Sequence, residues 1–163
     1  MGPHLDAYFA AEKTESLVFL GLGVAALAFA AFALWRLRDP LFRGMAIPLL
    51  LVGLIQVGVG ATILLRTGAQ LSALTALAQA APQDFKVQEL ARMETVRASF
   101  TVYKLIEVAF IVVGLVLALL PGARRFWRGF GFGMLIQGAL MLPADLLAEA
   151  RAAVYVQQIA ALP

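Results

Sequence analysis

The sequence contains no cysteine and no asparagine, and its only histidine is His4. The lack of cysteine excludes disulfides, zinc–thiolate sites and thiol chemistry. A single histidine cannot supply the paired axial ligands of a heme held between membrane helices, or the imidazoles of a non-heme iron site. No Ser-His-Asp set and no phosphate-binding loop can be identified. The sequence therefore predicts no cofactor and no metal, and it favours a non-catalytic protein.

Charged residues are also scarce. They make up 14% of the 163 residues, whereas a soluble domain contains about a quarter. Hydrophobic residues reach 62%, the mean hydropathy is +0.88, and the apolar residues form four blocks. About 20 apolar residues suffice for a helix to span a bilayer. We therefore expect an all-α integral membrane protein, a single domain over 1–163, with spans at about 16–35, 45–65, 101–120 and 126–145.

Basic residues are concentrated in two short connections between these spans, which hold six arginines: Arg36, Arg38, Arg43, Arg124, Arg125 and Arg128. The positive-inside rule places such connections in the cytoplasm. We therefore expect a multi-pass protein of the bacterial inner (cytoplasmic) membrane, with both termini and the 66–99 connection on the periplasmic, outer side. The opposite orientation would leave the arginines outside. The arginines lie at the edges of the membrane and do not form one patch. The pI of about 9.7 therefore does not indicate that the protein binds nucleic acid.

The connection between the second and third spans has the composition of a helix rather than of a loop. Its first part is rich in Ala, Leu and Gln, which favour helix. Pro82 interrupts this helix, Asp84 is placed to help start the next one, and apolar residues then recur with helical periodicity from Phe85 to Tyr103. The sequence thus predicts an up-down-up-down four-helix bundle whose helices extend beyond the membrane on the outer side, with a helical hairpin at about 66–100.

Ionisable and polar residues gather where the spans meet this extension. Eight of them are candidate ligand-binding residues: Glu15, Arg66, Arg97, Tyr103, Lys104, Glu107, Asp145 and Glu149. Glu107 lies deep, roughly 9 Å inside its span at about 1.5 Å per residue, so it must face the bundle, pair or carry a proton. We expect these side chains to converge in an outward-facing polar cluster. The cluster is either an ion-pair network that holds the helices in register or a pocket for a lipid or small amphiphile.

Polar and small residues inside the spans are expected to mediate helix contacts. Gln56 and Gln137 lie near the middle of the membrane, where glutamines hydrogen-bond between helices. Glycines of the second and fourth spans are expected to permit close helix approach: Gly53, Gly58, Gly60, Gly129, Gly131, Gly133 and Gly138.

Four stretches, ESLVFL, FRGMAIPLLLVGLIQ, RMETVRASFTVYKLIE and MLPADLLAEARAAVY, resemble a group of small bacterial four-helix inner-membrane proteins. That group has no known activity, so the resemblance implies a fold and a location but no functional residue. The membrane glutathione and eicosanoid transferases are similar in length and number of spans. Their charged motif is only faintly matched by Arg97, Tyr103 and Glu107, and the asparagine of that motif is missing.

The sequence thus predicts a protein that binds a lipid or small amphiphile in the polar cluster, or that is an accessory subunit of another membrane protein. The alternative is a small oligomeric transporter or channel with Glu107 as its coupling carboxylate, and a membrane transferase is less favoured. Expected partners are membrane lipids and either another membrane protein or further copies of the chain. The inner halves of the first and third spans, AALAFAAFAL and GLVLALL, contain no ionisable residue, which argues against a proton path across the membrane.

Overall fold

The computed structural model describes residues 2–162, with side chains from Leu5 onward. Four helices make up the fold: α1 (Gly2–Arg36), α2 (Pro40–Ala80), α3 (Pro82–Leu119) and α4 (Arg125–Ala160). Each is long and apolar enough to cross a membrane, and the described residues contain no strand. The expected all-α four-helix fold is confirmed.

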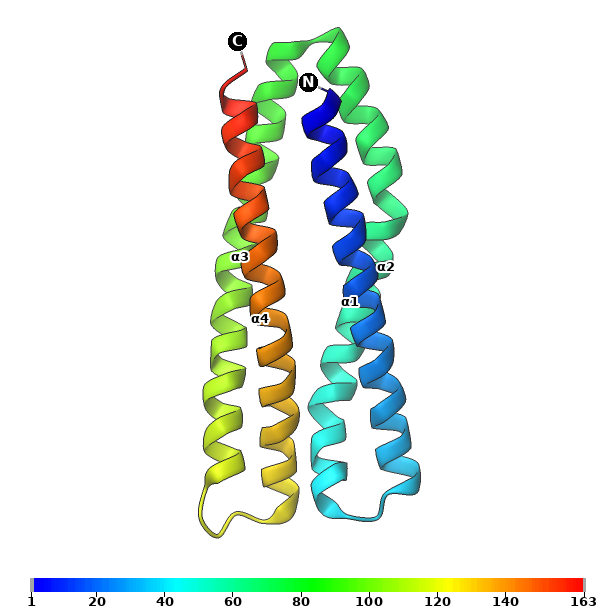
Figure 1. Ribbon diagram of the computed structural model, residues 1–163, viewed down its shortest axis with the longest axis vertical. Coiled ribbons are helices and arrows are strands. Elements are labelled where there is room, and N and C mark those ends of the chain that lie inside the picture. Colours follow the sequence, from blue (N-terminus) through cyan, green and yellow to red (C-terminus); the bar gives the residue numbers. More distant parts are fainter. Residues whose placement is uncertain (1, 163) are drawn as a thin grey trace.

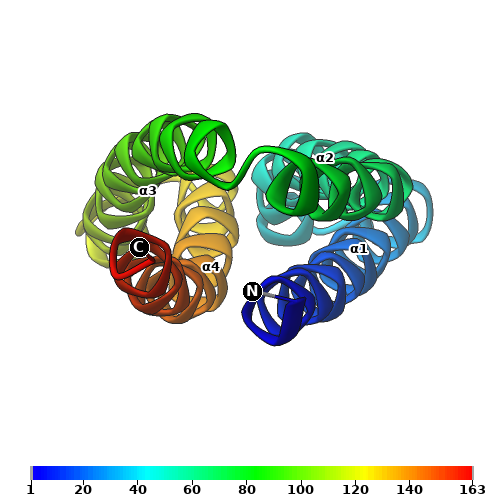
Figure 2. The same cartoon turned by 90° about the horizontal axis from the view of Figure 1, so that it is seen from above.

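The four helices form two antiparallel hairpins, α1 with α2 and α3 with α4, which lie side by side (Figure 1). In the half of the molecule that holds the turns at 37–39 and 120–124, α2 and α4 lie between α1 and α3, and α2 and α4 form the main contact between the hairpins (Figures 1 and 2). The turns at 37–39 and 120–124 lie at one end of the molecule, which we call the arginine-rich end. The start of α1, the end of α4 and the α2–α3 turn lie at the other end (Figure 1).

The helices are longer than a bilayer requires. They contain 35, 41, 38 and 36 residues, or roughly 50–60 Å at about 1.5 Å per residue, whereas the hydrocarbon core is about 30 Å thick. The parts beyond the apolar spans, residues 5–15, 66–100 and 146–160, are called the distal extension below. Here α2 and α3 are joined by a single residue, Ala81, and Pro82 begins α3, where its missing N–H is not needed.

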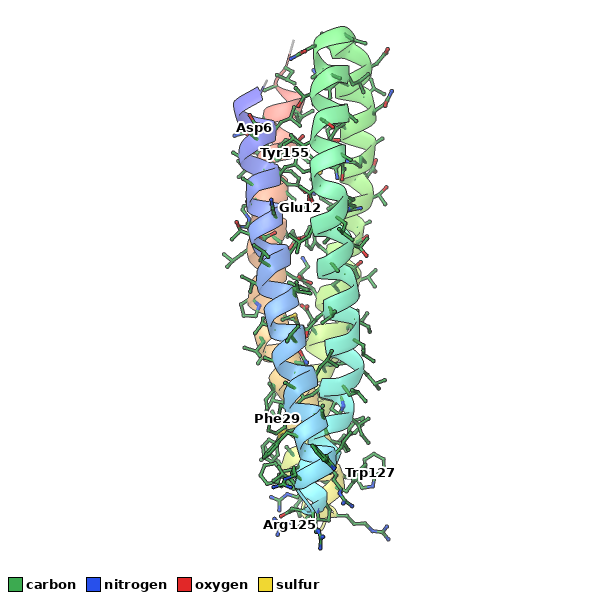
Figure 3. The ribbon with its side chains drawn as sticks, turned by 90° about the vertical axis from the view of Figure 1, so that its right-hand side faces the viewer. Asp6, Glu12, Phe29, Arg125, Trp127 and Tyr155 are labelled. Atoms are coloured by element: carbon green, nitrogen blue, oxygen red, sulfur yellow. The ribbon has the colours of Figure 1, made fainter. Side chains whose placement is uncertain are left out.

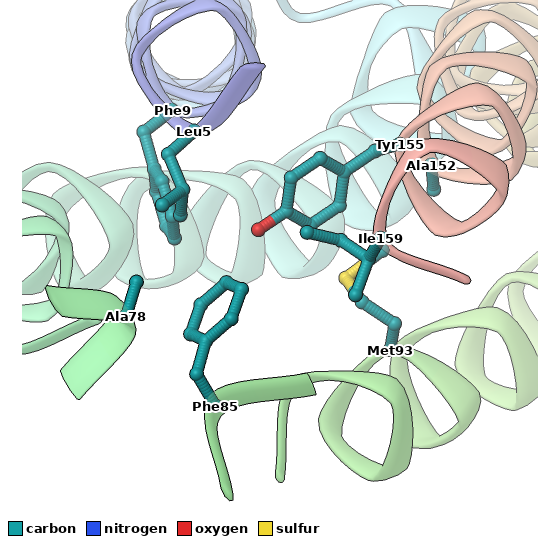
Figure 4. Close-up of a cluster of buried hydrophobic side chains, with 8 residues drawn as sticks. All are labelled: Leu5, Phe9, Ala78, Phe85, Met93, Ala152, Tyr155 and Ile159. Atoms are coloured by element: carbon teal, nitrogen blue, oxygen red, sulfur yellow. The ribbon is translucent and has the colours of Figure 1, made fainter. Parts of the chain in front are cut away.

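The distal extension contains the larger hydrophobic core. Eight buried side chains from all four helices form it (Figure 4): Leu5, Phe9, Ala78, Phe85, Met93, Ala152, Tyr155 and Ile159. The buried cluster inside the spans is made of Ala30, Ala33, Ala46 and Leu49. This division has a physical reason, because burial of large apolar side chains is favourable in water, whereas lipid is as apolar as the side chains and helices associate there through small residues.

Glycines bring the helices together inside the spans. A Cβ at Gly129 of α4 would overlap the carbonyl oxygen of Leu41 in α2, and one at Gly114 of α3 would lie 2.7 Å from the Gly131 carbonyl oxygen of α4. Six of the seven glycines expected to permit close approach do so. Gly58 is the exception, and the prediction is wrong there, because nothing lies within 4 Å of its Cβ position and it faces away from the other helices.

Candidate functional site

The charged side chains predicted to converge are distributed over separate ion pairs. Lys104 of α3 pairs with Glu149 of α4, with 2.5 Å between Nζ and Oε2, and Arg151 of α4 pairs with Glu15 of α1. Both pairs join different helices near the end of the apolar spans. Four charges therefore neutralise one another in the bundle, as a network that holds helices in register would require.

Arg66 does not join these pairs. Its guanidinium lies 3.8 Å from a carboxylate oxygen of Glu12 on α1, and its side chain is 52% exposed. Thr67 also donates to Glu12, at 3.3 Å. An exposed pair at this distance contributes at most about 1 kcal/mol, so Arg66 has a minor part in holding α1 and α2 together.

Two other candidates lie outside the bundle interior. Tyr103 is 50% exposed and Arg97 is exposed. Arg97 borders a surface hollow of about 280 Å³ between α3 and α4, whose lining is completed by Glu94, Ala98, Thr101 and Glu149. Because the lining combines one guanidinium with two carboxylates, the hollow has no strong preference for an anionic head group.

Glu107 is turned into the bundle, where it meets Asp145 of α4. Both carboxyl groups are buried, at 8% and 7% exposure, and they lie close enough to interact directly. Oε2 of Glu107 has no hydrogen-bond partner. Lys104, one helical turn away, is already paired with Glu149. The two acids that lie deepest among the candidates are therefore brought together without a positive charge.

The two glutamines are hydrogen-bonded across the α2–α4 contact, as predicted. Nε2 of Gln56 donates to Oε1 of Gln137 at 3.1 Å and to Sδ of Met141 at 3.0 Å. All three side chains are buried, and Oε1 of Gln56 has no partner.

A buried network in the distal extension was not predicted from the sequence. Glu89 is completely buried and accepts hydrogen bonds from Nε and Nη2 of Arg92, at 2.8 and 2.6 Å, and from the Tyr155 hydroxyl at 2.8 Å. Burial of Tyr155 raises the pKa of its phenol, and the nearby Glu89 carboxylate raises it further. The hydroxyl therefore remains a donor. One signal was available, because Glu89 lies four residues from both Phe85 and Met93 and thus on the same helix face as these core residues.

An apolar groove lies between the hairpins inside the spans. Its volume is about 260 Å³, and residues of α1, α2 and α4 line it: Leu22, Ala25, Ala26, Phe29, Met45, Leu49, Ile136, Gln137 and Leu140. These residues lie roughly 8–22 Å from the arginine-rich end at about 1.5 Å per residue. In Figure 3, Phe29 lies in the half of the molecule that ends at Arg125, whereas Tyr155 lies in the distal extension.

Comparisons of the chain with family models, curated proteins and solved structures found no match. In the described part of the chain, no three His, Cys, Asp or Glu side chains gather in a way that would hold a metal ion. Its four long apolar helices place the protein in the class of multi-pass four-helix membrane bundles.

Proposed function

We propose that this protein is a non-catalytic membrane protein that binds a lipid, with one acyl chain of the lipid in the groove between α1, α2 and α4. The groove is the observation that carries the proposal. Apart from Gln137 its lining is entirely apolar, which suits a hydrocarbon chain. Its volume of about 260 Å³ is slightly below the range of about 300–1,000 Å³ typical of small-molecule pockets, so it fits part of a chain rather than a whole amphiphile.

The groove is a better candidate than the polar cluster because the charged groups of that cluster that could best hold a head group are already paired. Lys104 is held by Glu149, and Glu15 is held by Arg151. A head group that displaced either partner would leave a partly buried charge without compensation, which is unfavourable. The ion pairs therefore support a structural role for these residues, and the lipid chain is assigned to the apolar groove.

The location is part of the proposal. We place the protein in the bacterial inner membrane, with the arginine-rich end in the cytoplasm, because short connections rich in arginine face that side. The exposed Trp35 and Trp127 lie beside these arginines, as expected of residues at a membrane interface. The bound chain would then come from the cytoplasmic leaflet, since the groove extends from near the arginine-rich end to the middle of the spans.

Native mass spectrometry of the protein purified from its own membranes in a mild detergent tests the proposal. Ala25 lines the groove and is exposed in it, so Ala25→Trp fills part of the space. Ala31 is exposed on the same helix but does not line the groove, which makes Ala31→Trp the matched control. The wild type and Ala31→Trp are expected to retain phospholipid, and Ala25→Trp is expected to lose most of it.

Equal retention of phospholipid by the three proteins would contradict the assignment of the chain to this groove. If no phospholipid is retained and another membrane protein co-purifies, the protein is an accessory subunit instead. The same spectra report a second copy of the chain directly, since a homo-oligomer differs in mass.

A further inference from the structure

We infer that Glu107, Asp145 and Gln56 form a buried site for one monovalent cation, a proton or Na⁺, in the middle of the bundle. This site is different from the lipid groove and goes beyond the proposed function. The inference starts from two oxygens without hydrogen-bond partners, Oε1 of Gln56 on α2 and Oε2 of Glu107 on α3. Their residues are 2% and 8% exposed. A buried acceptor without a partner costs about 1–3 kcal/mol, and more if it is charged.

The residues that carry these oxygens both contact the same segment of α4. The Gln56 amide nitrogen contacts the Met141 sulfur. A Cβ at Gly138 would lie 2.8 Å from the main-chain carbonyl oxygen of Glu107. Asp145 lies one helical turn beyond Met141. Gln56 and Met141 are both about 24 Å from the arginine-rich end, and Glu107 is about 18 Å from it at about 1.5 Å per residue. The Glu107 side chain leans toward the start of α3, which brings its carboxyl group close to the level of Met141.

No positively charged side chain compensates the two carboxyl groups. On α3 and α4, Lys104 pairs with Glu149, and Arg151 pairs with Glu15 of α1. The nearest basic residue of α2 is Arg66, which lies beside Glu12. Two adjacent carboxylates in surroundings of low dielectric repel one another, so a cation between them is strongly favoured.

The ligand atoms limit the choice of cation. Carboxyl and amide oxygens are hard ligands, which suit a proton or an alkali ion rather than a soft metal. Ca²⁺ and Mg²⁺ are usually held by several carboxylates or by substrate phosphates, and in the described part of the chain no third acidic side chain or histidine joins these two carboxyl groups to hold such an ion. A proton would be shared by Glu107 and Asp145, whereas Na⁺ would also use the Gln56 oxygen. Because GLVLALL and AALAFAAFAL lack ionisable residues, the cation reaches the site from the distal extension.

Labelling of the detergent-solubilised protein with dicyclohexylcarbodiimide tests the site. The reagent adds to a protonated carboxyl group, and the acylurea product keeps all atoms of both reactants. We expect a single adduct per chain, mapped by mass spectrometry to Glu107 or Asp145, with labelling that decreases as the pH rises. Protection by NaCl but not by choline chloride at equal ionic strength identifies Na⁺ as the occupant. Labelling that does not respond to NaCl identifies the proton.

Two variants separate this site from other carboxyl groups. Glu107→Gln keeps the shape of the side chain and is expected to lose most of the labelling. Glu94→Gln changes an exposed carboxyl group and is expected to label like the wild type. The inference is overturned if labelling maps to another residue. It is also overturned if the wild type is not labelled at any pH and its Tm is the same in NaCl and choline chloride across that pH range.

Discussion

At the scale of single residues, the buried carboxylates are of two kinds. One has its negative charge compensated by a nearby cation, and one pair has no such cation. Glu89 accepts three hydrogen bonds and faces a guanidinium, so its charge is stabilised within the distal extension. Glu107 and Asp145 have no such cation. Full compensation is expected of a structural residue, whereas an uncompensated acid inside a membrane span indicates a site.

The contribution of the Glu89 network can be measured with Tyr155→Phe. This variant removes one hydrogen bond to a charged acceptor without changing the packing of the ring. We expect it to lower the free energy of unfolding by about 1.5–3 kcal/mol. Tyr103→Phe is the matched control, because Tyr103 is half exposed, and its effect should stay within about 0.5 kcal/mol. The two variants are compared by chemical unfolding in detergent. Equal stability of both proteins would show that the Tyr155 hydroxyl does not stabilise the fold.

The candidate site was only partly predictable from the sequence, for reasons visible at individual residues. That Glu107 turns into the bundle follows from the energetic penalty of exposing a carboxylate to lipid. The partner of Arg66 was not predictable, because a long side chain near a membrane edge can reach several carboxylates and the choice of Glu12 depends on the rotation of α1 against α2. Glu89 was missed because burial of a carboxylate is unfavourable unless hydrogen-bond donors lie beside it. Its donors, Arg92 and Tyr155, could not be placed beside it from the sequence.

At the scale of the helices, contacts between α2 and α4 hold the two hairpins together, and glycines allow these contacts. The positions of the helices follow from the apolar blocks and from Pro82, so this part of the fold was predictable. It was harder to predict from the sequence which glycines lie in helix contacts. Gly58 and Gly60, for example, are two residues apart and point in different directions on a helix. Gly60 contacts α1, whereas Gly58 faces open space.

Gly129→Ala tests the α2–α4 contact. The added Cβ would overlap the backbone of Leu41, which cannot move aside as a flexible side chain would, so α2 and α4 must separate. We expect a loss of about 1–3 kcal/mol in stability, typical of overpacking, measured as a decrease in Tm in detergent. Gly58→Ala is the control and should be neutral, or more stable by up to about 1 kcal/mol from its better helix propensity. If the two variants have the same Tm, the α2–α4 contact is not close-packed at Gly129.

At the scale of the whole molecule, two environments stabilise different parts of the same four helices. In the distal extension, large side chains such as Phe9, Phe85 and Tyr155 form the core. In the spans, small residues bring the backbones together and large apolar side chains such as Ile55 and Leu119 remain exposed, where lipid surrounds them. We therefore expect membrane insertion and the packing of the extension to be separable, and the direction of insertion to depend on the arginines.

The orientation can be tested because the chain contains no cysteine, so that each introduced thiol is the only one. Gln79, at the end of α2, and Pro121, in the turn after α3, are both exposed and lie at opposite ends of the molecule. In intact bacterial cells whose outer membrane is permeable to the reagent, a membrane-impermeant maleimide should label Gln79→Cys and not Pro121→Cys. Lysis should make Pro121→Cys reactive, and the cysteine-free parent should remain unlabelled throughout. The reverse pattern would place the six arginines outside. It would show that the positive charge near the two short turns does not determine the direction of insertion.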